Sequence, residues 1–72
     1  MKIAVINFAK LKGKLREKNK TYKECADYLG IGESQFCRKI TGKVDFWFTE
    51  VINLARFLEL STDEFCAIFM NY

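Results

Sequence analysis

Apolar residues recur along most of the chain at the three- and four-residue spacing of amphipathic helices. Phe8, Leu11 and Leu15 share one stripe, and lysine and arginine fill most of the positions between them. A similar stripe starts at Val51. This periodicity predicts an all-α fold, a compact bundle of about five short helices in a single domain that spans residues 1–72.

Polar caps and glycines predict where these helices begin and end. Thr21 with Glu24, and Ser61 with Glu64, have the spacing of a capping box, in which each side chain bonds the backbone amide of the other residue. Gly30 is expected to end the helix that starts after Thr21, because the residue just past a helix end commonly needs a positive φ. The other predicted N-caps are Asn7, Gly32 and Thr49.

Two segments have a less regular pattern. Residues 3–6 are apolar and fit a strand, a backward extension of the first helix, or a short arm over the core. Residues 43–48 are expected to form a loop in which Phe46 and Phe48 are buried. Neither segment changes the prediction of one helical domain.

The stretch 21–42 predicts two short helices joined by a tight corner, since only residues 30–32 separate them. When each residue of the second helix is turned by about 100° from the last, Phe36 and Ile40 fall on the inner side. The outward strip then contains Ser34, Gln35, Arg38 and Thr41, flanked by Lys39. Hydrogen-bonding groups beside an arginine suit recognition of a partner, although surface helices are commonly polar.

Charge is distributed unevenly behind a net value of only +3. Residues 1–43 contain eleven lysines or arginines and four acidic residues, whereas residues 44–72 contain one arginine and five acidic residues. Such asymmetry indicates a basic face for a polyanion, and a solvated lysine-rich surface is the simpler alternative.

The candidate chemistry of the chain is sparse. There is no histidine, no phosphate-binding glycine loop and no catalytic constellation, so we expect neither an enzyme nor a metal, cofactor or small-molecule ligand. Cys25, Cys37 and Cys66 cannot all pair with one another, and we interpret them as reduced thiols. The opening residues fit neither a signal peptide nor a membrane span, so a cytoplasmic location is expected.

Several short motifs occur in the order typical of the phage repressor and Cro type of helix-turn-helix domain, also called the XRE family. They are T-x-x-E-x-A at residues 21–26, LGI at 29–31, S-x-x-x-RKI-x-GK at 34–43 and LSxDEF at 60–65. Over about residues 8–69 the chain resembles this family, and especially its short prophage repressors that consist of the DNA-binding domain alone. The resemblance implies a lambda-repressor-like fold with the helix-turn-helix at about residues 21–42.

The resemblance also implies a function, the binding of double-stranded operator DNA by a homodimer that acts as a small transcriptional regulator. The second helix of the motif would lie in the major groove. Residues expected at base edges are Glu33, Ser34, Gln35 and Arg38. Residues expected at phosphates are Tyr22, Lys23, Lys39, Thr41 and Lys43. These residue types suit their roles, because arginine can donate two bonds to guanine, glutamine can pair with adenine, and lysine suits phosphate oxygens.

The last predicted helix, at about residues 62–70, is apolar on nearly all sides. One small domain is not expected to bury every side, so a second subunit is predicted to cover the remainder. The expected dimer-interface residues are Phe65, Ile68, Phe69 and Tyr72. A helix-turn-helix module that binds a protein, as an antitoxin or a phage inhibitor does, is the alternative function, and aromatic residues such as Trp47 would suit it.

Overall fold

Five α-helices make up the part of the chain that the computed structural model describes, residues 6–69. They are α1 (Phe8–Glu17), α2 (Tyr22–Leu29), α3 (Glu33–Ile40), α4 (Phe48–Phe57) and α5 (Thr62–Phe69). The predicted all-α bundle of about five helices is confirmed. The predictions made for residues 3–5 and for Tyr72 lie outside the described residues.

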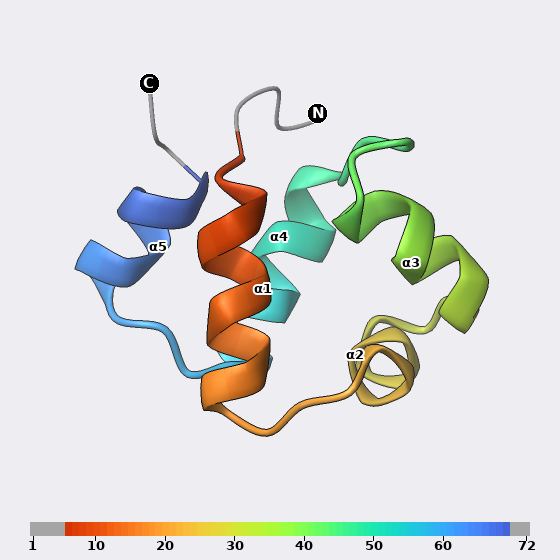
Figure 1. Cartoon of the computed structure of the whole chain (residues 1–72), viewed down its shortest axis with the longest axis horizontal. Coiled ribbons are helices and arrows are strands. Elements are labelled where there is room, and N and C mark those ends of the chain that lie inside the picture. Colours follow the sequence, from red (N-terminus) through yellow and green to blue (C-terminus); the bar gives the residue numbers. More distant parts are fainter. Residues whose placement is uncertain (1–5, 70–72) are drawn as a thin grey trace.

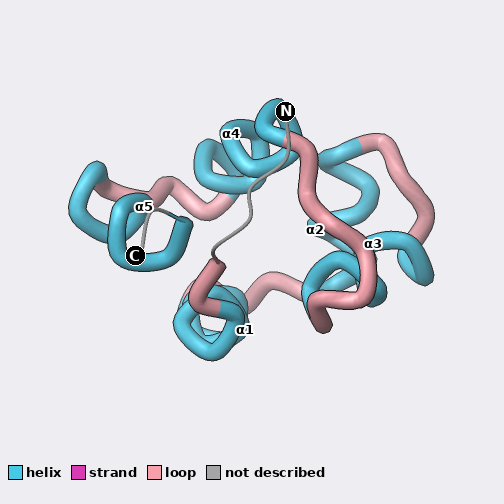
Figure 2. Tube along the Cα trace, turned by 90° about the horizontal axis from the view of Figure 1, so that it is seen from above, coloured by secondary structure: helices cyan, strands magenta, loops and turns pink. Residues whose placement is uncertain are grey.

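The helices are arranged with α3 at the edge of the molecule. α2 packs against both α3 and α4, and α1 packs against α5. Figures 1 and 2 show α2 and α3 at one end of the longest axis and α5 at the other, with α1 and α4 between them. No helix in residues 6–69 has the length and apolar character that crossing a membrane requires.

All five helices contribute apolar side chains to one core. The buried residues are Leu11, Leu15, Cys25, Ala26, Phe36, Ile40, Phe46, Val51, Leu54, Leu58, Ile68 and Phe69. Phe46 reaches the core from the loop before α4, as predicted, and its ring packs edge-on against Phe36 with the centroids 6.1 Å apart. Burial of each such ring stabilises the fold by about 1.5–3 kcal/mol, so this pair secures α3 to the loop that follows it.

The predicted capping boxes form at the starts of α2 and α5. The Thr21 hydroxyl accepts the Glu24 amide at 3.1 Å, and the Glu24 carboxylate accepts the Thr21 amide at 2.9 Å. Ser61 and Glu64 exchange the same two bonds at 3.2 and 2.9 Å. At the start of α1, Asn7 accepts the Lys10 amide at 3.1 Å, as predicted.

The start of α4 differs from the prediction by one residue. The helix begins at Phe48 with Trp47 as its N-cap, so Thr49 is not the cap. The cause is Glu50, whose carboxylate bends back to accept the Trp47 amide at 2.8 Å. Phe48 is 39% exposed in this arrangement, and its predicted burial is therefore wrong.

Four helices end with the same local structure. Asn19, Gly30, Gly42 and Glu59 all have a positive φ, of 59°, 74°, 84° and 53° respectively. In each case the amide of the next residue bonds the carbonyl five positions earlier; the pairs are Lys20 with Leu15, Ile31 with Ala26, Lys43 with Arg38, and Leu60 with Ala55. This is the hydrogen-bond pattern of the Schellman motif, which occupies carbonyls that a helix end leaves free.

The apolar residues of α5 mostly belong to the core of the same chain. Ile68 and Phe69 are each 1% exposed, because α1 packs against that side of α5. The Asn7 amide also donates to the Ile68 carbonyl at 2.7 Å. The prediction that Ile68 and Phe69 face a second subunit is therefore wrong. Phe65 is half-buried and lines a largely apolar groove of about 320 Å³ with Ile52 and Leu60.

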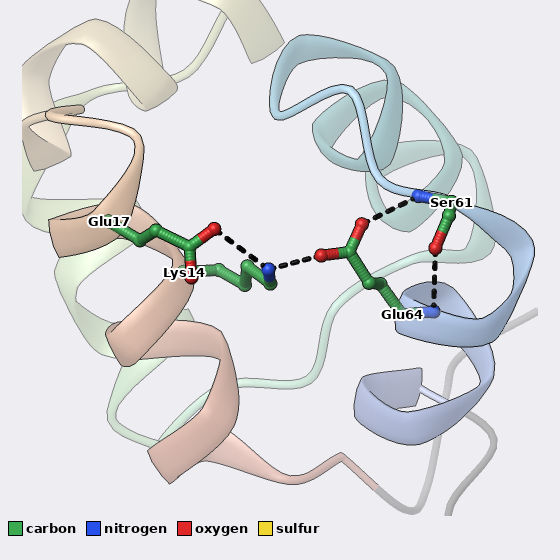
Figure 3. Close-up of polar contacts among 4 residues, drawn as sticks. All are labelled: Lys14, Glu17, Ser61 and Glu64. Carbon is green, nitrogen blue, oxygen red and sulfur yellow. Dashed lines mark hydrogen bonds and ion pairs between the residues drawn. The ribbon is translucent and has the colours of Figure 1, made fainter.

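An ion-pair cluster also joins α5 to α1 (Figure 3). The Lys14 ammonium pairs with Glu64 across the two helices and with Glu17 at 3.0 Å within α1. Glu64 still accepts the Ser61 amide, so its carboxylate serves both as a cap and as an anchor for α1. The hydrogen bond from Lys14 and then that from Ser61 lower the pKa of Glu64 to about 2.

Candidate nucleic-acid interface

The corner between α2 and α3 fixes the direction of the outer face of α3. Gly30 ends α2 with φ 74°, and Gly32 begins α3 as an N-cap that has no side chain. The Gln35 side-chain oxygen accepts the Gly32 backbone amide at 3.3 Å, which is the one hydrogen bond of a capping box that does not need a side chain on the cap residue. Phe36 and Ile40 then bury the inner face of the helix, as predicted. The remaining positions of α3 are largely turned toward solvent.

A groove of about 510 Å³ runs beside the outer face of α3, the start of α2 and the loop after α3. Its lining residues are Tyr22, Glu33, Ser34, Cys37, Arg38, Thr41 and Lys43. All of these except Cys37 were predicted to contact DNA. The structure thus brings together residues from two helices and a loop that the sequence pattern could assign only one by one.

Arg38 and Lys43 are the two cations of this groove, and the backbone holds them side by side. The Arg38 carbonyl accepts the amides of Lys43 at 2.9 Å and Val44 at 3.2 Å. Because α3 ends at Ile40 and Gly42 turns the chain back with φ 84°, the Lys43 side chain lines the same groove as Arg38. The arrangement presents an arginine fork and a lysine ammonium to one ligand.

Tyr22 and Thr41 lie at the same groove with more restricted chemistry. The Tyr22 ring packs on the buried Phe36 ring, with centroids 5.5 Å apart, which fixes the ring at the groove wall. The Thr41 hydroxyl donates to the Cys37 carbonyl at 2.8 Å. A hydroxyl carries a single hydrogen, so in this conformation Thr41 can accept a bond but has no donor left for a phosphate oxygen.

Gln35 and Lys23 lie outside the groove that the other predicted residues share. Gln35 lines a neighbouring groove of about 310 Å³ with Arg38, Val44 and Trp47. The exposed Lys23 ammonium is 3.6 Å from the Asp27 carboxylate within α2. Such a surface pair contributes only about 0–1 kcal/mol, so Lys23 can exchange this partner for a phosphate at little cost.

Lys39 does not belong to the exposed face. Its side chain is 8% exposed, and its ammonium donates to the Glu50 carboxylate at 2.9 Å and to the Asp45 carbonyl at 3.1 Å. The prediction that Lys39 contacts a phosphate is wrong, because the ammonium is bound inside the protein. The helical period contained the signal, since a residue three positions after Phe36 and one before Ile40 lies on the inner flank of α3.

The charge asymmetry of the sequence is partly cancelled in space. Lys14 and Lys39 come from the basic half of the chain, and their cross-helix partners Glu64 and Glu50 come from the acidic half. A third lysine, Lys20, lies with its ammonium 4.8 Å from the centre of the Phe57 ring. Within the groove itself the two cations Arg38 and Lys43 stand against one carboxylate, Glu33.

An exposed apolar rim, formed by Val44 and Trp47, lies beside the groove; it was not predicted as part of a DNA-binding site, although Trp47 was named for the alternative of binding a protein. Val44 and Trp47 are 44% and 57% exposed and line the neighbouring groove with Gln35. For Trp47 a signal was present, because it stands three residues before Glu50, at the spacing of a cap residue outside the helix.

Comparison with models of known protein families gives no match, and a search of curated proteins finds no significant relative.

Proposed function

We propose that this protein binds double-stranded DNA in a sequence-specific manner through the outer face of α3. The observation that carries the proposal is the groove that gathers Tyr22, Glu33, Ser34, Arg38 and Lys43 at the edge of the molecule. A helix at such an edge can enter the major groove of B-DNA, where base pairs differ in their donors and acceptors. The resemblance of residues 8–69 to phage repressor domains agrees with this role.

Arg38 is the principal base-reading residue in this proposal. Its guanidinium can donate two bonds to O6 and N7 of guanine, while Glu33 can accept from cytosine and Ser34 can serve either kind of base. Gln35 accepts the Gly32 amide with one lone pair of its side-chain oxygen, and its NH₂ group is left to donate to an acceptor on a base.

Lys43, Lys23 and the Tyr22 hydroxyl are the proposed phosphate contacts. Lys43 stands beside Arg38 in the groove, and Lys23 follows Tyr22 at the exposed start of α2. Contacts of this kind fix the position of a protein on the duplex without reading its sequence.

In line with the family that the sequence resembles, we propose a cytoplasmic transcriptional regulator of the prophage repressor type. Two copies would bind as a homodimer, because paired half-sites about 34–36 Å apart place two such helices in successive turns of the major groove. Ile68 and Phe69 are not part of the proposed subunit contact, since they are core residues.

Selection of bound sequences from random duplexes, at two salt concentrations, tests the proposal. We expect one preferred sequence at both concentrations, with an affinity that falls as salt rises because phosphate contacts release counterions. Binding that depends steeply on salt but selects no sequence would indicate general attraction to polyanions. Absence of binding at low salt would exclude a DNA-binding function.

The exposed apolar rim favours a second candidate function, the binding of a protein partner. Val44 and Trp47 are 44% and 57% exposed side by side in the lining of one groove, and an exposed apolar surface of this kind suits contact with a protein. If the main function is to bind a protein, Trp47→Ala should abolish binding of that partner and Arg38→Ala should leave it intact. If the function is to bind DNA, Arg38→Ala should lower duplex affinity more than Trp47→Ala does.

A further inference from the structure

The buried ion pair of Lys39 and Glu50 joins the last turn of α3 to the first turn of α4. The two charged atoms are 2.9 Å apart, and both side chains are largely withdrawn from water. Taking charges out of water is costly unless they are paired and fully hydrogen-bonded. Lys39 has a second acceptor, the Asp45 carbonyl, so two of its three N–H groups are bonded within the protein, and its ammonium also lies 6.0 Å from the centre of the Phe46 ring.

The same pair holds the second half of the loop between α3 and α4. Glu50 uses one oxygen, Oε1, to accept both the Lys39 ammonium and the Trp47 amide, the latter at 2.8 Å. The first half of the loop is held by the Arg38 carbonyl, which accepts the Lys43 and Val44 amides. Residues 43–47 are thus attached to α3 at one end and to the Lys39–Glu50 pair at the other.

We propose that Lys39 and Glu50 are positioning residues, which fix residues 43–47 so that Lys43 and Trp47 keep their places beside Arg38. In this role Lys39 acts on the groove from inside and touches no ligand. The part of the proposal that concerns DNA rests on the proposed function. The part that concerns the loop stands on the contacts of Lys39 and Glu50 alone.

Trp47 provides a readout of the loop that does not depend on DNA. It is the only tryptophan of the chain, it is exposed, and its own amide is one of the bonds in question. The fluorescence anisotropy of Trp47 and the hydrogen exchange of the Val44 and Trp47 amides therefore report whether the loop is held.

Lys39→Met is the first variant, because methionine can fill much of the same space without the charge. We expect lower Trp47 anisotropy and exchange of the Trp47 amide faster by roughly tenfold, the factor that loss of a hydrogen-bond network to a charged group implies. Lys14→Met is the matched control, since Lys14 also pairs with a carboxylate across two helices, but at the α1–α5 contact. It should leave Trp47 anisotropy and exchange at the wild-type values.

Two substitutions of Glu50 keep the test decisive if Lys39→Met fails to fold. Glu50→Gln retains an oxygen for the Trp47 amide, whereas Glu50→Ala removes it. We expect Glu50→Ala to accelerate Trp47 exchange and Glu50→Gln to restore most of the protection. Equal exchange in wild type, Glu50→Ala and Lys39→Met would overturn the positioning role.

Duplex binding completes the test. Lys39→Met should lower affinity severalfold and reduce the salt slope by about one unit, as removal of one phosphate contact does, because Lys43 loses its place. Loss of protection at Trp47 with unchanged affinity and slope would overturn the proposed effect on DNA. If wild-type protein bound no duplex, the proposed function would fail, and Trp47 anisotropy and exchange would still decide the positioning role.

Discussion

The Glu64 carboxylate receives the Lys14 ammonium from another helix while it accepts the Ser61 amide in its own capping box. One side chain thus starts α5 and attaches it to α1, although the two residues are far apart in the sequence. Both contacts favour the charged carboxylate, which is why its pKa falls to about 2.

The depressed pKa of Glu64 predicts a loss of stability in acid. The ordinary value is 4.5, so the contribution of Glu64 is complete above that pH and is lost as pH falls toward about 2. In Glu64→Gln the contribution should be absent at every pH. We therefore expect the difference in free energy of unfolding between wild type and Glu64→Gln to be constant near neutral pH and to shrink between about pH 5 and pH 2.

Urea denaturation at several pH values measures this difference. Glu17→Gln is the control, since Glu17 pairs with the same lysine but only within α1. That variant should keep the acid sensitivity of the wild type. A difference for Glu64→Gln that stays constant down to pH 2 would contradict the assigned role of the Lys14–Glu64 contact.

Glu59 is a site where a single substitution should stabilise the protein. It adopts a φ of 53° in the Schellman motif after α4, a conformation that is unfavourable for a residue with a Cβ. We expect Glu59→Gly to raise the free energy of unfolding by about 0.5–1 kcal/mol, the strain relieved being larger than the flexibility gained by the unfolded chain.

The urea midpoint with an unchanged m-value measures this gain. Asn19→Gly serves as the comparison, because Asn19 has a similar φ of 59° after α1 but asparagine tolerates that region better. Its effect should be smaller than that of Glu59→Gly. Equal effects at the two positions would show that the side chain is not the source of strain at Glu59.

Local rules predicted most of the fold, because caps and periodic stripes act over three to five residues. The Thr21–Glu24 box, the Gly30 turn and the buried positions Phe36 and Ile40 all follow from residues close in sequence. The groove residues on α3 could be predicted for the same reason, since helical phase alone separates Arg38 from Phe36.

Interactions between distant elements could not be predicted in this way. Lys39 has the composition of a surface residue, and only Glu50 and the Asp45 carbonyl make its burial possible. Phe69 belongs to an apolar helix that was predicted to contact a second subunit, but α1 packs against that helix within the same chain. Both of these errors concern a partner that folding brings from another element, whereas the error at the start of α4 was local, because Glu50 caps the helix through the Trp47 amide.

The three cysteines should differ sharply in reactivity. Cys25 is fully buried, and this burial raises its pKa to about 11, so its thiolate is both scarce and inaccessible. Cys37 and Cys66 are exposed. We expect a thiol reagent at pH 8 to label Cys37 and Cys66 in native protein and Cys25 only after unfolding, as peptide mass analysis would show.

Because Cys37 lines the groove, its labelling also reports on the proposed interface. A bound duplex should slow modification of Cys37 and leave Cys66 on α5 unaffected. Equal protection of both thiols would indicate a general effect of the polyanion, and protection of Cys66 alone would place the DNA at the wrong end of the molecule.

Replacing Arg38 and replacing Lys43 should lower the affinity for DNA in different ways, although both residues are cations of one groove. Arg38→Ala should cost about 1–3 kcal/mol on the preferred duplex and relax the preference at one base pair, because a two-bond contact to guanine disappears. Lys43→Ala should weaken the binding of all duplexes alike and reduce the salt slope by about one unit, because a phosphate contact disappears.

Arg56→Ala is the control for lost charge, since Arg56 lines the separate groove between α4 and α5. Titration of each variant against matched and mismatched duplexes at several salt concentrations distinguishes these outcomes, and a uniform loss for Arg38→Ala would reassign that residue to the phosphates.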